Sequence, residues 1–271
     1  MVEWLIEPLA YSFFQRGLAG GILAAIACGV LSGFIVWRGM AFIGDALSHS
    51  ILPGIVLAYA LGVNLLIGAV LASMVAVAGI GMITRKNGLK EDSAIGVIFT
   101  GLFALGILML SKISTYQDLT HILFGNILGI SSSDLLIIGG IVLLVVLSVF
   151  LFYKELLVTS FDPVHAETIG LSPSLIQYGL LIVIALTTVV SIQSIGVVLI
   201  LALLVTPAAS ASMLVKELPW IIALGTLFAV LSSISGFYVS YYMDVASGPA
   251  IVIILTTIFL ICFTWNHLVR K

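Results

Sequence analysis

Apolar runs, each close to the length of a membrane-spanning helix, follow one another through almost the whole sequence. A helix that crosses a bilayer needs about 20 predominantly apolar residues, because each residue adds about 1.5 Å along a hydrocarbon core about 30 Å thick. Charged and turn-forming residues divide the 271-residue chain into nine such runs, namely 17–37, 40–62, 65–84, 93–111, 134–153, 174–192, 196–215, 219–242 and 248–266. The pattern predicts an all-α, polytopic transmembrane bundle of eight or nine spans.

The balance of charged and apolar residues excludes a water-soluble fold. Only 8% of the residues are charged and 62% are hydrophobic, whereas a soluble domain carries about 25% charged residues. Most of the surface must therefore face lipid. The net charge of −2 gives no reason to expect a nucleic-acid partner. Since no linker rich in Pro, Gly or Ser and no clear internal repeat divides the sequence, we expect one domain over 1–271.

The positions of lysine and arginine predict the orientation. If the C-terminus is cytoplasmic, eight of the ten basic residues lie inside and two, Arg16 and Lys112, lie outside, as the positive-inside rule requires. This orientation places the loop 154–173 inside and the loop 112–133 outside. The eight inner residues are Arg38, Arg85, Lys86, Lys90, Lys154, Lys216, Arg270 and Lys271.

Asp45 and His49 lie within the second apolar run, four residues apart and therefore on one helical face. Counted from residue 39 at the inner boundary, Asp45 lies about 9 Å deep in the membrane and His49 about 15 Å deep, close to the midplane. Ionisable side chains in a membrane span are costly unless they face a polar path or a partner. One carboxylate and one imidazole suit Mn, Fe or Zn better than Cu(I). Pro53 has no amide hydrogen to donate to the His49 carbonyl, so we expect that carbonyl oxygen to be free as a further ligand at the same level. An internal Asp–His hydrogen bond that only fixes packing is the alternative.

A second acid–imidazole pair, Asp118 and His121, lies in the outer loop with a spacing of three. These two side chains are candidates for an outer vestibule that collects cations. A loop pair without a role is the equal alternative, because polar residues in loops need no special reason.

The inner loop contains the signals of a short capped helix. Asp162 is suited to the N-cap, Pro163 to the first helical position and Gly170 to the stop. A helix of about seven residues is unstable alone, so packing or a partner must hold it. A plain connecting turn is the alternative. The residues assigned to this element are Asp162, Pro163, Val164, His165, Ala166, Glu167, Ile169 and Gly170.

Thr206 and Pro207 precede a run of small residues, which favours close helix packing or a subunit interface over pore lining. Cys28 and Cys262 each lie in an apolar run, so we expect buried thiols rather than a disulfide. The chain has no G-x-x-x-x-G-K-[ST] phosphate loop. Energy for transport must therefore come from another chain or from an ion gradient.

With these motifs the chain resembles the membrane subunits of the manganese, zinc and iron family of ABC importers. The resemblance extends over nearly the whole chain, and its motifs are specific only when taken together. They are Asp45-Ala-Leu-Ser-His49-Ser-Ile-Leu-Pro-Gly54, Leu123-Phe124-Gly125-Asn126, Phe161-Asp162-Pro163, Gly196-Val-Val-Leu and Ala202-Leu-Leu-Val-Thr206-Pro207-Ala-Ala.

The resemblance implies a non-enzymatic transport subunit in the plasma or inner membrane. It implies a homodimer, a separate ABC ATPase subunit, an extracytoplasmic metal-binding protein and no permanently bound cofactor. The helix before Gly170 is similar to the coupling helix that docks on the ATPase, and Asp45 and His49 match positions that handle the metal. The Phe161-Asp162-Pro163 motif favours the manganese branch, with zinc or iron(II) uptake as the alternative.

An ion-coupled secondary transporter or channel is the main rival, because an intramembrane Asp and His also occur in proton-coupled carriers. Such carriers usually contain inverted repeats, which this sequence does not clearly show. A membrane scaffold or receptor would leave Asp45 and His49 unexplained.

Overall fold

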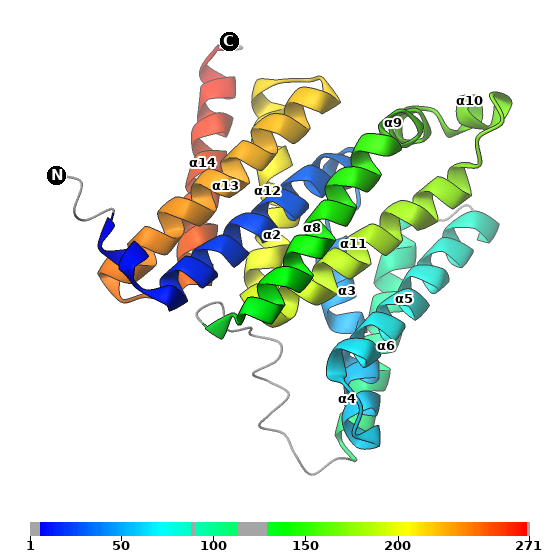
Figure 1. The fold of residues 1–271 in the computed structure, drawn as a ribbon. Coiled ribbons are helices and arrows are strands. Elements are labelled where there is room, and N and C mark those ends of the chain that lie inside the picture. Colours follow the sequence, from blue (N-terminus) through cyan, green and yellow to red (C-terminus); the bar gives the residue numbers. More distant parts are fainter. Residues whose placement is uncertain (1–5, 88–89, 113–128, 270–271) are drawn as a thin grey trace. The chain divides into compact units, whose positions relative to one another are not determined.

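The computed structural model describes residues 6–87, 90–112 and 129–269, and within these ranges it is helical and contains no strand (Figure 1). Between the longer helices lie short elements that shape the ends of the bundle. The elements are η1 (Pro8–Ala10), α2 (Ser12–Trp37), α3 (Ile43–Ser50), α4 (Leu52–Leu61), α5 (Leu65–Asn87), α6 (Glu91–Leu110), α8 (Ser132–Leu151), α9 (Tyr153–Phe161), α10 (Pro163–Thr168), α11 (Pro173–Ile195), α12 (Val197–Leu214), α13 (Leu218–Met243) and α14 (Ser247–Val269).

The expected series of membrane spans is confirmed. In the described part of the chain, nine helical segments are long and apolar enough to cross a bilayer. Their ends differ from the sequence-based ranges by a few residues, which is the usual uncertainty of helix boundaries. Phe150 and Leu136 on α8 are 79% and 78% exposed, as expected of hydrocarbon side chains that face lipid.

Two short elements depart from the sequence-based ranges. The run 40–62 is not one continuous helix, because the chain breaks at Ile51 between α3 and α4, where Pro53 occupies the first turn of α4. The loop 154–173 is largely helical, because α9 begins directly after a break at Phe152 that ends α8. The sequence therefore predicted the spans but not these two breaks.

The backbone divides into two compact units, which are described separately. The first unit contains 1–36, 121–143 and 191–271, and the second contains 37–120 and 144–190. This division does not test whether 1–271 is one domain, which stays a prediction.

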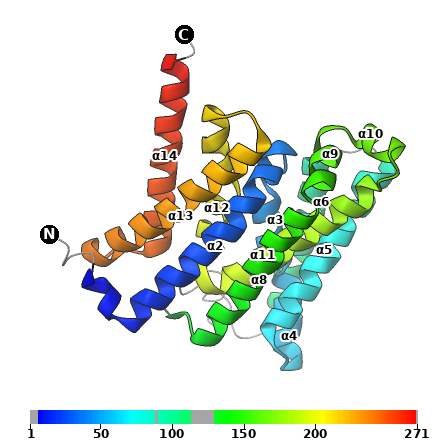
Figure 2. The ribbon, with the colours of Figure 1, turned by 45° about the horizontal axis from the view of Figure 1, so that its top comes forward.

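In the first unit α12, α13 and α14 pack against one another (Figures 1 and 2). Helix α2 also lies against α13, and glycines allow this close approach: a Cβ atom at Gly29 would lie 2.7 Å from Cα of Thr226. Gly21 similarly lies against Ser233 and Phe237. Small residues at helix crossings are how membrane helices bring their backbones together. Cys28 and Cys262 are buried free thiols, as expected.

In the second unit α3, α4, α5 and α6 form a packed group, and α10 forms the tip between α9 and α11 (Figures 1 and 2). Gly54 on α4 faces Gly68 on α5 at backbone contact. This crossing lies one residue after Pro53 and therefore fixes α4 directly beyond α3. The second unit contains all the described candidate residues for metal handling and partner docking.

Candidate functional site

Asp45 and His49 lie one turn apart on α3. The Nε2 atom of His49 is 3.4 Å from Oδ1 of Asp45, and the two side chains are 31% and 41% exposed, respectively. A hydrogen bond from a ring nitrogen to oxygen usually measures 2.7–3.2 Å, so this pair is close but not tightly bonded. Asp45 lies in the first turn of α3, where the helix dipole favours a carboxylate. The geometry therefore leaves Nε2 of His49 and Oδ1 of Asp45 available as ligands for a cation.

The imidazole of His49 lies against two aromatic rings of α6. Its centroid is 5.0 Å from the Phe103 ring and 5.8 Å from the Phe99 ring, and the two phenyl rings stack at 5.9 Å. These rings limit the positions that the imidazole can take and place hydrocarbon beside it. Neither ring was predicted to be part of the site, although their spacing of four places them on one helical face.

Two details of the expected geometry are wrong. Helix α3 begins at Ile43 rather than near residue 39, because Gly39 has a φ of +71° and the chain turns before the helix starts. Helical rise therefore counts only from Ile43, which shortens it by about 6 Å, whereas the depth of the pair in the membrane stays a prediction. The His49 carbonyl is also not left without a hydrogen bond, since the amide of Ile51 donates to it. A carbonyl oxygen has two lone pairs, so one remains.

Asp45 and His49 form a pair rather than a complete metal site. In the ranges that the structure describes, no group of three or more His, Cys, Asp or Glu side chains could hold a metal ion. Asp118 and His121 lie outside the described residues. Further ligands for an ion at this pair must be water, backbone oxygens or groups from elsewhere.

The capped helix predicted in the inner loop is present as α10. The side chain of Asp162 accepts a 2.8 Å hydrogen bond from the backbone amide of His165, and Pro163 occupies the first turn. At the other end Gly170 has a φ of +85°. Its amide donates to Glu167, while the Leu171 amide donates to Ala166. These bonds form a Schellman motif, which satisfies the last carbonyls of the helix.

Most of α10 is exposed. Ala166 is buried, whereas Val164 and Ile169 are 73% and 54% exposed. The polar residues Asp162, His165 and Glu167 are exposed as well. A six-residue helix with two exposed apolar side chains is suited to docking on a partner.

The Thr206–Pro207 segment has the packing environment that its sequence favours. Pro207 is buried inside α12, and a Cβ atom at Gly225 on α13 would lie 3.2 Å from the Pro207 carbonyl carbon. Ala208 continues the same buried surface together with Ala211 and Ile221. These contacts favour helix packing for Pro207.

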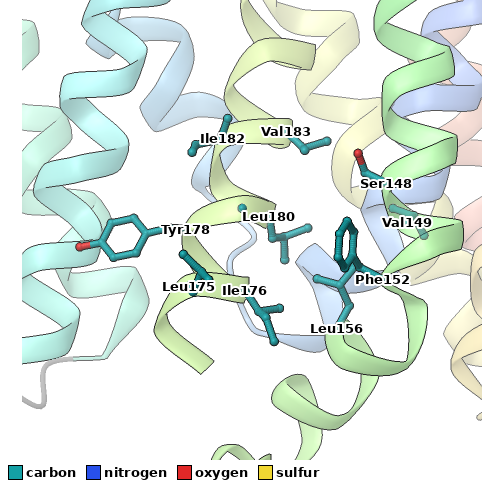
Figure 3. A pocket seen from close by; sticks show the side chains of 11 residues that line it. Ser148, Val149, Phe152, Leu156, Leu175, Ile176, Tyr178, Leu180, Ile182 and Val183 are labelled. Atoms are coloured by element: carbon teal, nitrogen blue, oxygen red, sulfur yellow. The ribbon is translucent and has the colours of Figure 1, made fainter. Parts of the chain in front are cut away.

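An apolar pocket of about 370 Å³ lies between the end of α8, α9 and the start of α11 (Figure 3). Figure 3 shows Phe152 and Leu156 facing Ile176 and Leu180 across it, while Tyr178 points away from them. No carboxylate, imidazole or thiol lines this pocket, so it offers no metal ligand.

Comparisons with known proteins agree with this architecture. The family model ABC-3, the ABC 3 transport family, matches residues 10–266. The manganese transport system membrane protein MntC of Halalkalibacterium halodurans is 45% identical over 96% of this chain and 89% of its own length. The chelated iron transport system membrane protein YfeD of Yersinia pestis is 41% identical over 97% of this chain and 88% of its own length.

A solved structure extends the similarity to three dimensions. PsaBC from Streptococcus pneumoniae, in complex with Fab, superposes with a TM-score of 0.83 and 36% identity over 97% of this chain and 95% of that chain. The family match covers nearly every residue of the sequence, including all nine helical segments of membrane-spanning length, apart from a few terminal residues. The chain is thus a multi-pass membrane permease that belongs to the ABC 3 transport family.

Proposed function

We propose that this protein is the permease subunit of an ATP-driven importer of divalent transition metal, and that manganese is its substrate. The observation that carries the proposal is the pairing of Asp45 and His49 at 3.4 Å on α3. A carboxylate oxygen and an imidazole nitrogen form a donor set that accepts Mn, Fe or Zn. The relatives named as manganese transport proteins support manganese among these ions.

In this proposal Asp45 supplies negative charge to an ion that has lost part of its water, and His49 supplies a nitrogen lone pair. The other positions around the ion keep water or take backbone oxygens, so binding is weak enough for release. Phe99 and Phe103 lie beside the imidazole, and they limit how far water can follow the ion. This combination suits passage of an ion rather than storage.

We infer that α10 docks on a separate ATPase chain, which hydrolyses ATP. Asp162 and Gly170 cap its two ends, and the exposed Val164 and Ile169 supply the apolar contacts. Because α10 has only six residues, it needs its caps and a partner surface to keep its shape.

The complete importer in this proposal is a homodimer of this chain in the plasma or inner membrane, with the C-terminus cytoplasmic. An extracytoplasmic metal-binding protein delivers the ion on the outer side. The name of the solved relative, PsaBC, and the family match support an assembly of more than one kind of chain. Asp118 and His121 stay candidates for the outer vestibule.

Uptake of radiolabelled manganese tests the proposed function. The chain is expressed with its cognate ATPase and binding protein in cells that lack their own manganese importers, and unlabelled zinc or iron(II) competes. The expected result is ATP-dependent manganese uptake that a tenfold molar excess of zinc reduces only partly. Uptake that needs no ATPase, but collapses with the proton gradient, would identify an ion-coupled carrier instead.

A further inference from the structure

Arg38 connects the segment before α3 to the last turn of α9. Its Nε atom donates a 2.9 Å hydrogen bond to Oγ of Ser160, and Nη2 donates a 3.1 Å hydrogen bond to Oγ1 of Thr159. Both hydroxyls use their own protons on the backbone of α9, since Ser160 donates to the Leu156 carbonyl and Thr159 to the Glu155 carbonyl. The two oxygens are therefore fixed acceptors for the guanidinium.

An aromatic contact strengthens the same connection. The ring of Trp37 lies 4.7 Å from the ring of Phe161 between centroids. Two consecutive residues thus hold three consecutive residues of α9, by hydrogen bonds and by apolar contact. The next residue, Asp162, is the N-cap of α10, and Asp45 follows Arg38 by seven residues. The contact therefore joins the residues that directly precede the proposed docking helix α10 to the segment that leads into α3, the helix with Asp45 and His49.

Glu91 connects α6 to α11. Its Oε1 atom accepts a 2.7 Å hydrogen bond from Nε2 of Gln177 on α11. Burial lowers the pKa of the Arg38 guanidinium, and the charge of Glu91 opposes that shift. Glu91 is the first residue of α6, the helix that places Phe99 and Phe103 against His49. Glu91 therefore acts on Arg38 through its charge, from the helix that lies against His49.

We propose that Arg38 is the positioning residue that transmits movement of α9 and α10 to α3, and so couples ATP hydrolysis to passage of the ion. This inference rests on the proposed function. A displacement of α10 pulls on Thr159 and Ser160, and their hydrogen bonds to Arg38 move the start of α3.

The test measures manganese uptake and phosphate release together, in proteoliposomes that contain the full importer. Arg38→Gln keeps hydrogen-bonding capacity but removes the charge and the fork of donors. We expect ATP hydrolysis to persist while the number of ions imported per ATP falls by about tenfold. Thr159→Val together with Ser160→Ala removes the two acceptors while Arg38 stays, and should have the same effect. Lys154→Gln is the matched control, because it removes an exposed cation from the same helix α9.

A double variant separates transmission from simple charge compensation. In Arg38→Gln the half-buried Glu91 carboxylate loses its counter-charge, which can lower stability. Arg38→Gln with Glu91→Gln removes that penalty, so assembly should return to the wild-type level while ions per ATP stay low. Wild-type coupling in the double variant, or in the Thr159/Ser160 variant, would overturn the inference. If the wild-type importer shows no ATP-dependent uptake, it is the proposed function that fails.

Discussion

Gly54 of α4 and Gly68 of α5 lie so close together that a Cβ atom on either one would collide with the carbonyl oxygen of the other. Ala72 and Ala58 extend this contact on each side. Because Pro53 precedes Gly54, the crossing holds α4 at the point where the chain leaves α3. Backbone contact between two helices leaves no space into which a side chain could move.

Gly54→Ala should therefore destabilise the protein, by about 1–3 kcal/mol for an overpacked contact. The expected result is a lower midpoint of thermal unfolding in detergent, followed by tryptophan fluorescence. Gly101→Ala is the matched control, since a Cβ there would meet nothing within 4 Å. It should leave the midpoint unchanged or raise it, because alanine favours helix over glycine. Equal midpoints for Gly54→Ala and wild type would contradict the close crossing.

The caps of α10 predict how the docking helix responds to substitution. Asp162→Ala removes the acceptor for the His165 amide, which costs about 0.5–2 kcal/mol at an N-cap. Gly170→Val places a β-branched residue at a φ of +85°, a conformation that costs about 1–2 kcal/mol. Both variants should reduce the amount of ATPase recovered with the purified permease.

Asp162→Asn supplies the control, because asparagine also caps helices well. It should restore most of the ATPase recovery that Asp162→Ala loses. Replacing Val164 and Ile169 with aspartate should abolish recovery while the membrane bundle stays folded. Normal recovery in that double variant would show that the ATPase docks elsewhere.

The distribution of basic residues predicts that Lys86 and His165 face the cytoplasm and that Lys112 faces outward. The hydrogen bond from Arg38 to Thr159 agrees with part of this topology, since it holds together two segments that are both expected on the inner side. Single cysteines at the three positions can be tested in intact cells with an impermeant thiol label. Native Cys28 and Cys262 are buried and should give little background. Labelling of intact cells at residue 86 or 165 would contradict the predicted orientation.

The spans and the caps of α10 could be predicted from sequence because their signals are local. About 20 apolar residues, or Asp-Pro followed by Gly, specify an element without reference to the rest of the chain. The only sequence signal for the break at Ile51 was Pro53. A proline can either kink or end a helix, and the sequence does not distinguish the two outcomes. Helix α9 was missed because Lys154 and Glu155 end the apolar run of α8, so the residues after them were assigned to a loop.

The surroundings of the ion pair could not be predicted, because they depend on residues far apart in the chain. Phe103 reaches His49 only after α6 packs against α3. Arg38 and Ser160 are separated by 122 positions, and no local pattern relates them. From sequence, Arg38 was simply one of eight inner basic residues. Its hydrogen bonds to Thr159 and Ser160 show that it connects the start of α3 to α9.

We propose that Asp45 and His49 handle the ion. The most direct test is the initial rate of radiolabelled manganese uptake by importers with Asp45→Asn or His49→Ala. Each substitution removes a donor that binds the cation, so uptake should fall by at least about tenfold. Recovery of the ATPase with each variant should match that of wild type.

Ser48→Ala is the matched control on the same helix, since the buried Ser48 hydroxyl only bonds the Gly44 carbonyl of α3. It should import manganese at the wild-type rate. Wild-type uptake by fully assembled Asp45→Asn and His49→Ala importers would mean that the pair is a packing contact and that the ion crosses by another route.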